Sequence, residues 1–462
     1  MRLNSGDRVL FFGDSITEQH LWTLYLENLL LWHEPGLAIR NRGWAANRAV
    51  DGLARFDRDA APLAPTWVFV AFGVNDGRYL PPTGAIADEY GAALSRLVSR
   101  VRSIGAEPVL CSPSAVDEGC DPMLKGYNET LVLLTQRCQT VAQREGARFV
   151  DLFRPLLAAG PGLAPDGIHP NPQGHLIMAR AAAKQLGLTG RGPLLNDGTP
   201  DPLLPWRSSA PLPAGLHSVF VDGERAGNYD ASDLTRGVTL RGGALRARAR
   251  AVMALSQSIW QADRAAWRTY GPLGLDGSRS PAAAAALQAV VTRLEESRRQ
   301  LLQQPFRVEP QPEVPIRLGP WAVSGPYFPD SPELLLSQPF APEEDPGSAS
   351  DWRTVAPAGP EGYVDLVPLL GPVNQAVAYA RCSFAAPADG ELLLRLGSDD
   401  GYRLFLNGAP AADVPLFRGS APGQEVHRLP VRRGLNHLLL RIHQGVGGWD
   451  FYATAYLRPN GG

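Results

Sequence analysis

Lysine is scarce in this 462-residue chain, and neither sign of charge predominates. Only Lys125 and Lys184 are lysines, so arginine supplies almost all of the 44 basic residues. These face 46 acidic residues, which leaves a formal net charge of −2. Proteins that bind nucleic acid or an anionic membrane surface usually carry a clear basic excess. The charge balance therefore argues against both kinds of partner.

Cysteine is scarce as well, with four in the whole chain, too few for a disulfide scaffold. They are Cys111, Cys120, Cys138 and Cys382. None belongs to a Cys-x-x-Cys or Cys/His spacing of the kind that holds zinc. Cys138 shares a helical stripe with Leu131 and Leu134, which predicts a buried thiol. We therefore expect no metal and no other cofactor.

Long apolar runs are also lacking, since no stretch reaches the roughly 18 residues that a membrane-spanning helix needs. The first eight residues lead directly into an apolar run and lack the features of a signal peptide. We expect either a cytoplasmic protein or an exported one without its leader. The hydrophobic content of 44% with a small net charge excludes a disordered chain, and the length predicts two or three domains.

The first part of the chain, residues 1–190, alternates short apolar runs with longer amphipathic stretches. The runs are typical of strands buried on both faces and comprise Val9–Phe12, Leu37–Arg40, Trp67–Phe72, Pro108–Cys111 and Arg148–Val150. The predicted helices are Thr17–Trp32, Ala85–Ser103, Gly126–Arg144 and Pro172–Leu186. This alternation predicts an α/β domain with a doubly wound parallel sheet, whose ligands bind beyond the carboxyl ends of the strands.

Residues 191–305 form a second segment with a Pro- and Gly-rich linker, a small β unit and two helices. The β unit is predicted over His217–Asp222 and Arg225–Tyr229, joined at Asp222-Gly223. The helices, Leu245–Tyr270 and Pro281–Gln304, are expected to pack as a hairpin on the first domain, the alternative being a coiled-coil arm for a partner.

Residues 306–462 have a third texture, in which Pro-rich connections separate short apolar runs. The predicted strands are Leu392–Leu396, Tyr402–Leu406, His427–Val431, His437–Ile442 and Phe451–Tyr456. Asn407-Gly408 and the Gly434–Asn436 segment are turn signals between them. This pattern predicts an antiparallel β-sandwich.

Two motifs close the first two predicted strands of the α/β domain. The first strand ends in Gly13-Asp14-Ser15, and a helix follows at once, so Ser15 is expected at the carboxyl edge of the sheet. By itself Ser15 is more typical of a helix cap. The second strand ends in Asn41-Arg42-Gly43-Trp44, where a glycine lets a backbone N–H approach a ligand or simply makes a turn.

Two further motifs follow the third strand and precede the last helix of the domain. Gly73-Val74-Asn75-Asp76 places the amide donor of Asn75 at the same sheet edge, or uses it as a turn residue. Asp166 lies three residues before His169, a spacing at which the carboxylate can turn back and hold the imidazole ring.

Together, Ser15, Gly43, Asn75 and His169 resemble the four blocks of the SGNH, or GDSL-type, hydrolase family, in the right order over residues 7–188. The resemblance implies a flavodoxin-like sheet and a serine esterase. It makes Ser15 the nucleophile, His169 the general base and then acid, and Asp166 the residue that orients His169. The Ser15 and Gly43 backbone N–H groups and the Asn75 side chain would form the oxyanion hole.

The second block departs from the family pattern, which usually has another glycine a few residues after Gly43. Here the chain continues as Trp44-Ala45-Ala46-Asn47, which puts the shape of the acyl pocket in doubt. Trp44 is expected to bind substrate as a wall of that pocket, although it could also only pack. His175 is expected on the helix surface or in packing, and Asp14 and Asp76 are expected to be structural.

The segment from Gly397 to Gly408 resembles the core strand pair of β-sandwich modules of the protective-antigen or galactose-binding-like kind, many of which bind sugars. Trp352, Tyr402 and Trp449 could offer aromatic faces to a sugar or pack in the core, and Asp399-Asp400 is predicted as a turn rather than a Ca²⁺ site. We expect an esterase that removes short acyl groups, acetyl above all, from an acylated saccharide or another small ester. The alternatives are a lipolytic esterase or thioesterase, and a non-catalytic carbohydrate-binding or adhesion protein.

Overall fold

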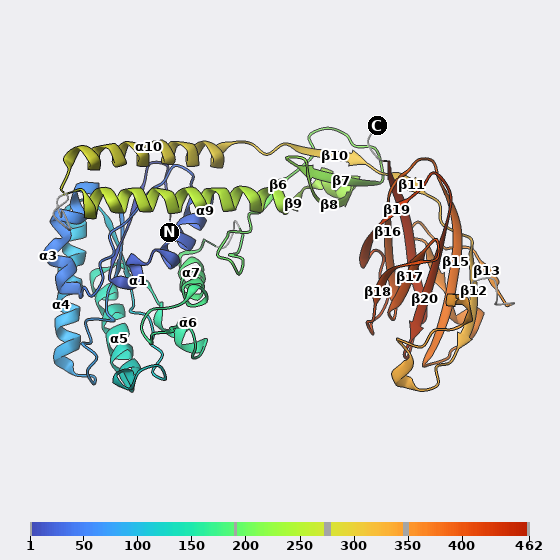
Figure 1. Ribbon diagram of the computed structural model, residues 1–462, viewed down its shortest axis with the longest axis horizontal. Helices are drawn as coiled ribbons and strands as arrows, with labels where there is room; N and C mark the ends of the chain where they lie inside the picture. The colour runs from blue at the N-terminus through green and yellow to red at the C-terminus, as the bar shows by residue number, and fades with distance from the viewer. Residues whose placement is uncertain (1, 189–191, 272–278, 345–350, 460–462) are drawn as a thin grey trace. The chain divides into compact units, whose positions relative to one another are not determined.

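The computed structural model describes residues 2–188, 192–271, 279–344 and 351–459 (Figure 1). The chain divides into two compact units. The first comprises residues 1–206, 220–227 and 237–309, and the second comprises residues 207–219, 228–236 and 310–462.

The first unit is built on a five-stranded parallel sheet of order β2-β1-β3-β4-β5. Its strands are β1 (Arg8–Gly13), β2 (Ala38–Asn41), β3 (Trp67–Ala71), β4 (Glu107–Cys111) and β5 (Arg148–Val150). All five predicted apolar runs are therefore strands, within a residue or two at each end. The predicted doubly wound parallel sheet is confirmed.

Seven helices in the described part of residues 1–206 flank this sheet. They are α1 (Ser15–Glu18), α2 (Leu21–His33), α3 (Ala49–Asp59), α4 (Gly84–Ser103), α5 (Tyr127–Glu145), α6 (Phe153–Ala158) and α7 (Pro172–Leu186). Helix α2 packs beside α7, while α3, α4 and α5 follow one another side by side. Short 3₁₀ turns lie at Ala61–Leu63 and Pro122–Leu124. The core includes Cys138, which is fully buried as predicted.

The predicted helix over Thr17–Trp32 is wrong in one respect, because the chain forms two helices there. His20 takes a left-handed conformation with φ 65° and interrupts the helix between α1 and α2. Its ring is buried and hydrogen-bonds Thr23 Oγ1 at 3.0 Å. The apolar pattern runs through this break, so periodicity alone did not reveal it.

A helical hairpin completes the first unit. It consists of α9 (Gly243–Arg264), which continues as a π-helical turn over Ala265–Thr269, and α10 (Pro281–Gln303). The two long helices run side by side in Figure 1. Helix α9 packs on α2 and β2, and Val252 joins the core of the α/β fold. The hairpin thus packs on the first domain, as predicted.

Further strands form two small sheets. β6 (Leu204–Trp206) pairs with β9 (Val238–Leu240), and a three-stranded sheet has the order β10-β7-β8. Its strands are β7 (Leu216–Val221), β8 (Glu224–Asp230) and β10 (Val308–Pro312), and α8 covers Ala231–Arg236. The β7–β8 turn uses Asp222 and Gly223, both at positive φ, which suits a tight hairpin.

The second unit contains two antiparallel sheets, as the sequence predicts. One has the order β11-β21-β16-β19 with β14 paired to β21, and the other has the order β13-β12-β15-β20-β17-β18. The strands are β11 (Val314–Ile316), β12 (Trp321–Tyr327), β13 (Arg353–Val355), β14 (Tyr363–Asp365), β15 (Ala376–Ala386), β16 (Gly390–Asp399), β17 (Tyr402–Leu406), β18 (Ala409–Val414), β19 (Glu425–Val431), β20 (Gly434–Gln444) and β21 (Asp450–Pro459). Short helical segments lie at Pro332–Leu334, Ala341–Glu344 (α11) and Val367–Leu370 (α12).

The two sheets enclose a separate apolar core that includes Tyr402 and Trp449. These two side chains are 1% and 0% exposed, so neither offers a face to a sugar. Trp352 is half-buried, and the guanidinium of Arg381 lies 4.0 Å from its ring centre. Within the described residues no helix is long and apolar enough to cross a membrane.

Candidate active site

Ser15 is the first residue of α1, directly after β1. Asp14 caps this helix by accepting the Ile16 N–H at 3.0 Å. Gly13 allows the tight passage from strand to helix, because a Cβ there would lie 2.3 Å from the Ala71 carbonyl oxygen and 2.4 Å from Thr17 Oγ1. The half-buried Ser15 side chain is thus placed at the carboxyl edge of the sheet, as predicted.

The structure brings Ser15, His169 and Asp166 together in one chain of hydrogen bonds. His169 Nε2 lies 2.8 Å from Ser15 Oγ, and His169 Nδ1 lies 2.6 Å from Asp166 Oδ2. The histidine and aspartate side chains are 31% and 56% exposed. This arrangement can move a proton from the serine hydroxyl to the imidazole while the carboxylate holds the ring.

The Asp166 carboxylate is held in its ionised form. Its partial burial would raise the pKa, but hydrogen bonds from the backbone N–H and ring of His169 and from the Ile168 N–H outweigh burial. The pKa of Asp166 is lowered to about 2 as a result. A carboxylate that stays charged can stabilise a positive charge on His169.

Asp14 and Asp76 are buried carboxyl groups with structural contacts. Burial raises the pKa of each to about 7, against the hydrogen bonds that each accepts from backbone N–H groups. Asp76 accepts the Ala49 N–H at 2.9 Å, at the beginning of α3. Both contacts fix helix starts beside the site, in agreement with the structural role we expected.

Asn75 follows β3 and is half-buried. Its Nδ2 donates to the Asn47 carbonyl oxygen at 3.0 Å, and its Oδ1 accepts the Tyr79 hydroxyl at 3.2 Å. A side-chain amide has two N–H donors, so one remains beside the one that Asn47 uses. Asn75 is therefore oriented by its neighbours and keeps a donor for a ligand.

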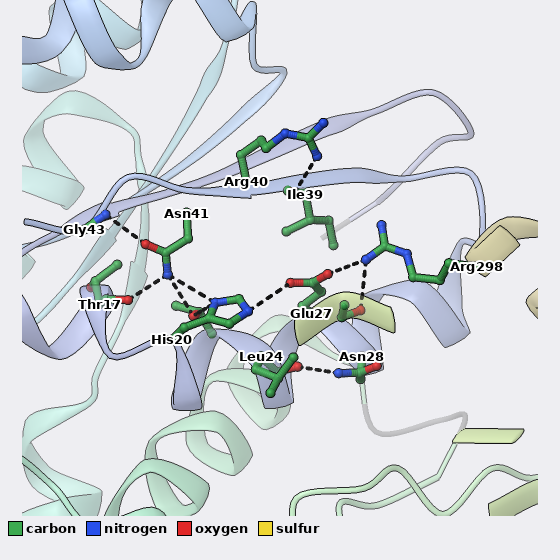
Figure 2. A network of polar contacts seen from close by, with 12 residues as sticks. Thr17, His20, Leu24, Glu27, Asn28, Ile39, Arg40, Asn41, Gly43 and Arg298 are labelled. Carbon is green, nitrogen blue, oxygen red and sulfur yellow. Dashed lines mark hydrogen bonds and ion pairs between the residues drawn. The ribbon is translucent and has the colours of Figure 1, made fainter. Parts of the chain in front are cut away.

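The backbone N–H of Gly43 is already hydrogen-bonded in this structure. It donates to Asn41 Oδ1 at 2.8 Å (Figure 2). The glycine itself is required by close packing, since a Cβ at position 43 would lie 2.2 Å from the backbone nitrogen of Glu18. The Gly43 N–H would have to leave Asn41 before it could bind an oxyanion. The motif itself did not reveal this bond to Asn41.

Ala46 is a residue that our sequence reasoning missed. It adopts the left-handed conformation, with φ 61°, in a turn closed by the Asn47 N–H and the Trp44 carbonyl at 3.3 Å. Its own N–H has no hydrogen-bond partner within the described ranges of the chain. A signal for this conformation was available, since the family pattern usually has a glycine a few residues after Gly43. Glycine is the residue that the left-handed region favours.

Trp44 is half-buried beside the site. Its backbone N–H donates to the Gly13 carbonyl at 3.0 Å, which anchors it next to the end of β1. Its ring makes an edge-to-face contact with Trp267 at a centroid distance of 5.6 Å, and the Arg268 guanidinium lies 4.1 Å from its centre. The hairpin therefore supports the indole from one side.

A buried polar network runs beneath the Gly43 segment (Figure 2). Arg298 of α10 donates to Glu27 at 2.5 Å, and Glu27 Oε2 lies 4.0 Å from His20 Nε2. Asn41 Nδ2, 3.4 Å from His20 Nδ1, also donates to the Thr17 carbonyl at 2.7 Å. Burial and the nearby Arg298 lower the pKa of His20 to about 3, so this ring stays neutral.

His175 is a packing residue, one of the two roles that we expected. It is fully buried on α7, where Nε2 lies 2.9 Å from Gln19 Oε1 and Nδ1 accepts the Trp22 N–H at 3.3 Å. Burial lowers its pKa to about 3. Among the described residues no group of three or more His, Cys, Asp or Glu side chains is placed to hold a metal ion.

Comparison with known proteins shows what the α/β part of the first unit is similar to. Residues 11–177 match the family described as "GDSL-like Lipase/Acylhydrolase family". The acetylxylan esterase of Geobacillus stearothermophilus is 27% identical over 214 residues, which make up 40% of this chain and 97% of that protein. Residues 11–177 are therefore similar to the GDSL-like family, and the chain is a carboxylic ester hydrolase.

One solved structure agrees with the fold. A gut microbial diltiazem-metabolizing enzyme matches 66% of this chain and 97% of its own, with a TM-score of 0.51 and 17% sequence identity. At that identity the likeness concerns the fold alone. A crystal structure of the Geobacillus stearothermophilus acetylxylan esterase covers 40% of this chain and 97% of its own, at 27% identity and a TM-score of 0.35.

Proposed function

Because this chain is a carboxylic ester hydrolase similar to the GDSL-like family over residues 11–177, we propose that it is a serine esterase that removes acetyl or other short acyl groups from carbohydrate. One observation carries the proposal. The hydrogen bonds from Ser15 Oγ to His169 Nε2 at 2.8 Å, and from His169 Nδ1 to Asp166 at 2.6 Å, join a nucleophile to a base and an orienting carboxylate.

The proposed reaction has two halves. Ser15 Oγ attacks the ester carbonyl carbon while its proton passes to His169 Nε2. The tetrahedral intermediate then collapses, the bond to the leaving oxygen breaks, and His169 gives its proton to the departing alcohol. Water next attacks the acyl-serine by the same route, which releases the acid and restores Ser15.

The negative oxygen of the tetrahedral intermediate needs hydrogen-bond donors. Ser15 N–H and the remaining Asn75 N–H are two of those predicted from the sequence. The third predicted donor, Gly43 N–H, would have to exchange Asn41 for the oxyanion. The partner-free N–H of Ala46, in the same segment, needs no such exchange and is an alternative third donor among the described residues.

The substrate class rests on the comparison and on the openness of the site. The relative from Geobacillus stearothermophilus is named an acetylxylan esterase. The match covers 97% of that relative and 40% of this chain. The 31% and 56% exposure of the His169 and Asp166 side chains leaves room for an alcohol portion as bulky as a saccharide. We assign Trp44 to the acyl side, where its indole would limit the length of the acyl chain.

The decisive experiment measures acetate release from a panel of acetylated oligo- and polysaccharides, with the Ser15→Ala variant as the blank. We expect release from at least one saccharide and none with the variant. Aryl acetate and aryl octanoate are compared in parallel. A preference for octanoate would favour the lipolytic or thioesterase alternative, and no turnover of any ester would favour a non-catalytic binding protein.

A further inference from the structure

Glu18 connects the helical hairpin to the segment that follows Gly43. It lies in α1, three residues after Ser15. Its Oε2 accepts the Ala45 N–H at 2.6 Å. Its Oε1 accepts hydrogen bonds from two arginines of the hairpin, Arg264 at 2.8 Å and Arg268. One carboxylate thus holds both the hairpin and the 44–47 turn.

Arg268 contacts the turn a second time through Trp44. It lies in the π-helical turn at the end of α9, and its guanidinium stacks on the Trp44 ring at 4.1 Å. The side chain is only 12% exposed, and that of Glu18 is 16% exposed. A charge pair that is largely removed from water keeps a more fixed geometry than an exposed pair.

The turn that these groups hold is the one that carries the partner-free Ala46 N–H. Residue 44 is tied to Gly13 through its N–H, and residue 47 is tied to Asn75 through its carbonyl oxygen. The Ala45 N–H has Glu18 as its anchor. The left-handed conformation of Ala46 is unfavourable for a residue with a Cβ, so neighbouring contacts have to hold it. The bond from the Ala45 N–H to Glu18 is one of these contacts.

We propose that Arg268, assisted by Arg264, is a positioning residue for catalysis that acts through Glu18 on the 44–47 turn. The hairpin thereby helps to set the geometry of the donors that face the transition state. Misplaced donors weaken binding of the transition state more than binding of the substrate. This inference rests on the proposed serine esterase function.

The test is a double-mutant cycle on the full chain with a small aryl acetate as substrate. Arg268→Gln and Glu18→Gln should each lower kcat about 10-fold, which is less than the loss caused by removing a whole oxyanion donor. KM should stay within about 2-fold of the wild-type value. The double variant should fall little below either single variant, because Arg268 acts through Glu18. Arg268→Lys, which keeps the charge, should recover most of the activity.

One further variant is a matched control, and a second is an independent test of the proposal. Arg250→Gln removes an exposed arginine of the same helix that pairs with Asp197 at 3.4 Å, and kcat should stay unchanged. Arg264→Gln, at a 44% exposed side chain, should lower kcat in the same direction as Arg268→Gln but less. The melting temperature of each variant shows whether it folds. If Arg268→Gln does not fold, Arg264→Gln tests the proposal in its place.

The proposal is overturned if neither arginine variant changes kcat, if only KM changes, or if the two losses in the cycle multiply fully. Failure of the proposed serine esterase function would look different. The wild type itself would then not turn over aryl acetate, or the Ser15→Ala variant would keep the activity.

Discussion

Asp166 holds His169 at two points. Its Oδ2 lies 2.6 Å from the ring Nδ1, and its Oδ1 accepts the backbone N–H of the same histidine at 2.7 Å. These bonds help to lower the pKa of Asp166 to about 2, against the effect of its partial burial. The direction in which His169 Nε2 points, toward Ser15, therefore depends on one charged carboxylate.

Replacing Asp166 by Asn should lower kcat on the order of 10⁴-fold, as loss of the orienting carboxylate does in other serine hydrolases. The amide removes the negative charge and can present an N–H to His169 Nδ1, which favours the wrong tautomer. Steady-state kinetics on an aryl acetate checks this. A loss below 10-fold would show that Asp166 is not the orienting residue.

The Asp166 carboxylate should stay ionised over the whole pH range in which the esterase is assayed. Hydrogen bonds from His169 and from the Ile168 N–H lower its pKa to about 2, against the effect of its partial burial. The side-chain carboxyl carbon of Asp166, followed by ¹³C NMR in the Ser15→Ala variant, should therefore show no titration between pH 4 and 8. A titration step in that range that disappears in Asp166→Asn would contradict this assignment.

Replacing Ser15 by Ala should abolish nearly all ester hydrolysis. Loss of the nucleophile in such a triad costs on the order of 10⁶ in kcat, and a second replacement at His169 should then add little, since the residues act as a unit. Circular dichroism should show an intact fold. Retention of a tenth of the activity in pure protein would refute the nucleophile assignment.

Replacing Asn75 by Ala should be milder, with kcat lowered about 10²- to 10³-fold because one oxyanion donor is lost. KM should change little, since charge builds on the oxygen only in the transition state. Asn75→Asp is the matched control, because it keeps the size of the side chain but replaces the donor Nδ2 by an acceptor oxygen. Its kcat should be lowered at least as much as that of Asn75→Ala. An increase in KM at constant kcat would instead make Asn75 a substrate-binding residue.

The sheet and the Ser15–His169–Asp166 cluster could be predicted from the sequence because each depends on a local pattern. Apolar runs marked the strands, and short motifs at the strand ends marked the site. The break at His20 could not be predicted, since its left-handed conformation depends on buried partners, Thr23 among them. Helix α3 was also missed, although its start has a local cap, in which Asp51 accepts the Arg48 N–H at 2.9 Å, as well as the distant contact from the Ala49 N–H to Asp76.

The surroundings of the site depend on long-range contacts that no local pattern encodes. Glu18 reads as an ordinary residue of a helix, yet it binds two arginines about 250 residues away in sequence. The bond between Gly43 N–H and Asn41 is only two residues in span, but the Asn41 side chain is held in place by Thr17. Sequence motifs therefore located this segment without showing which of its N–H groups are free.

Replacing Asp76 by Asn should change how stability depends on pH. Burial raises the folded-state pKa of Asp76 to about 7, so between pH 4 and 7 the folded protein holds a proton that the unfolded chain has lost. The contribution of this proton to the free energy of unfolding is complete below about pH 4 and disappears as pH rises through 7. Asn cannot ionise and keeps an acceptor for the Ala49 N–H.

Urea unfolding at pH 4.5, 6 and 8 tests this. The free energy of unfolding of Asp76→Asn, relative to wild type, should increase with pH, by at most about 4 kcal/mol for a shift of three pKa units. Asp88→Asn, at a side chain that is 70% exposed, is the control and should leave the slope unchanged. Parallel curves for Asp76→Asn and wild type would contradict the raised pKa.

The last prediction concerns the β-sandwich, which we expect to add affinity for polysaccharide without taking part in the chemistry. With Tyr402 and Trp449 buried in its core, binding has to use another surface. The sheet that contains β15, β17 and β20 bears a hollow of about 810 Å³, lined among others by Arg381, Asn407 and His437. Such polar side chains around an apolar floor suit hydroxyl-rich ligands.

The full-length double variant Arg381→Ala/His437→Ala should therefore lose activity on acetylated polysaccharide at low substrate concentration and keep its activity on aryl acetate. A tethered binding module raises the local concentration of polymer but not the rate of the chemical step. Deleting residues 306–462 is a poorer test, because residues 207–219 and 228–236 belong to the same compact unit and would remain behind. Equal loss on both substrates would make the sandwich a structural module, and no loss on polymer would remove this hollow from consideration as its binding surface.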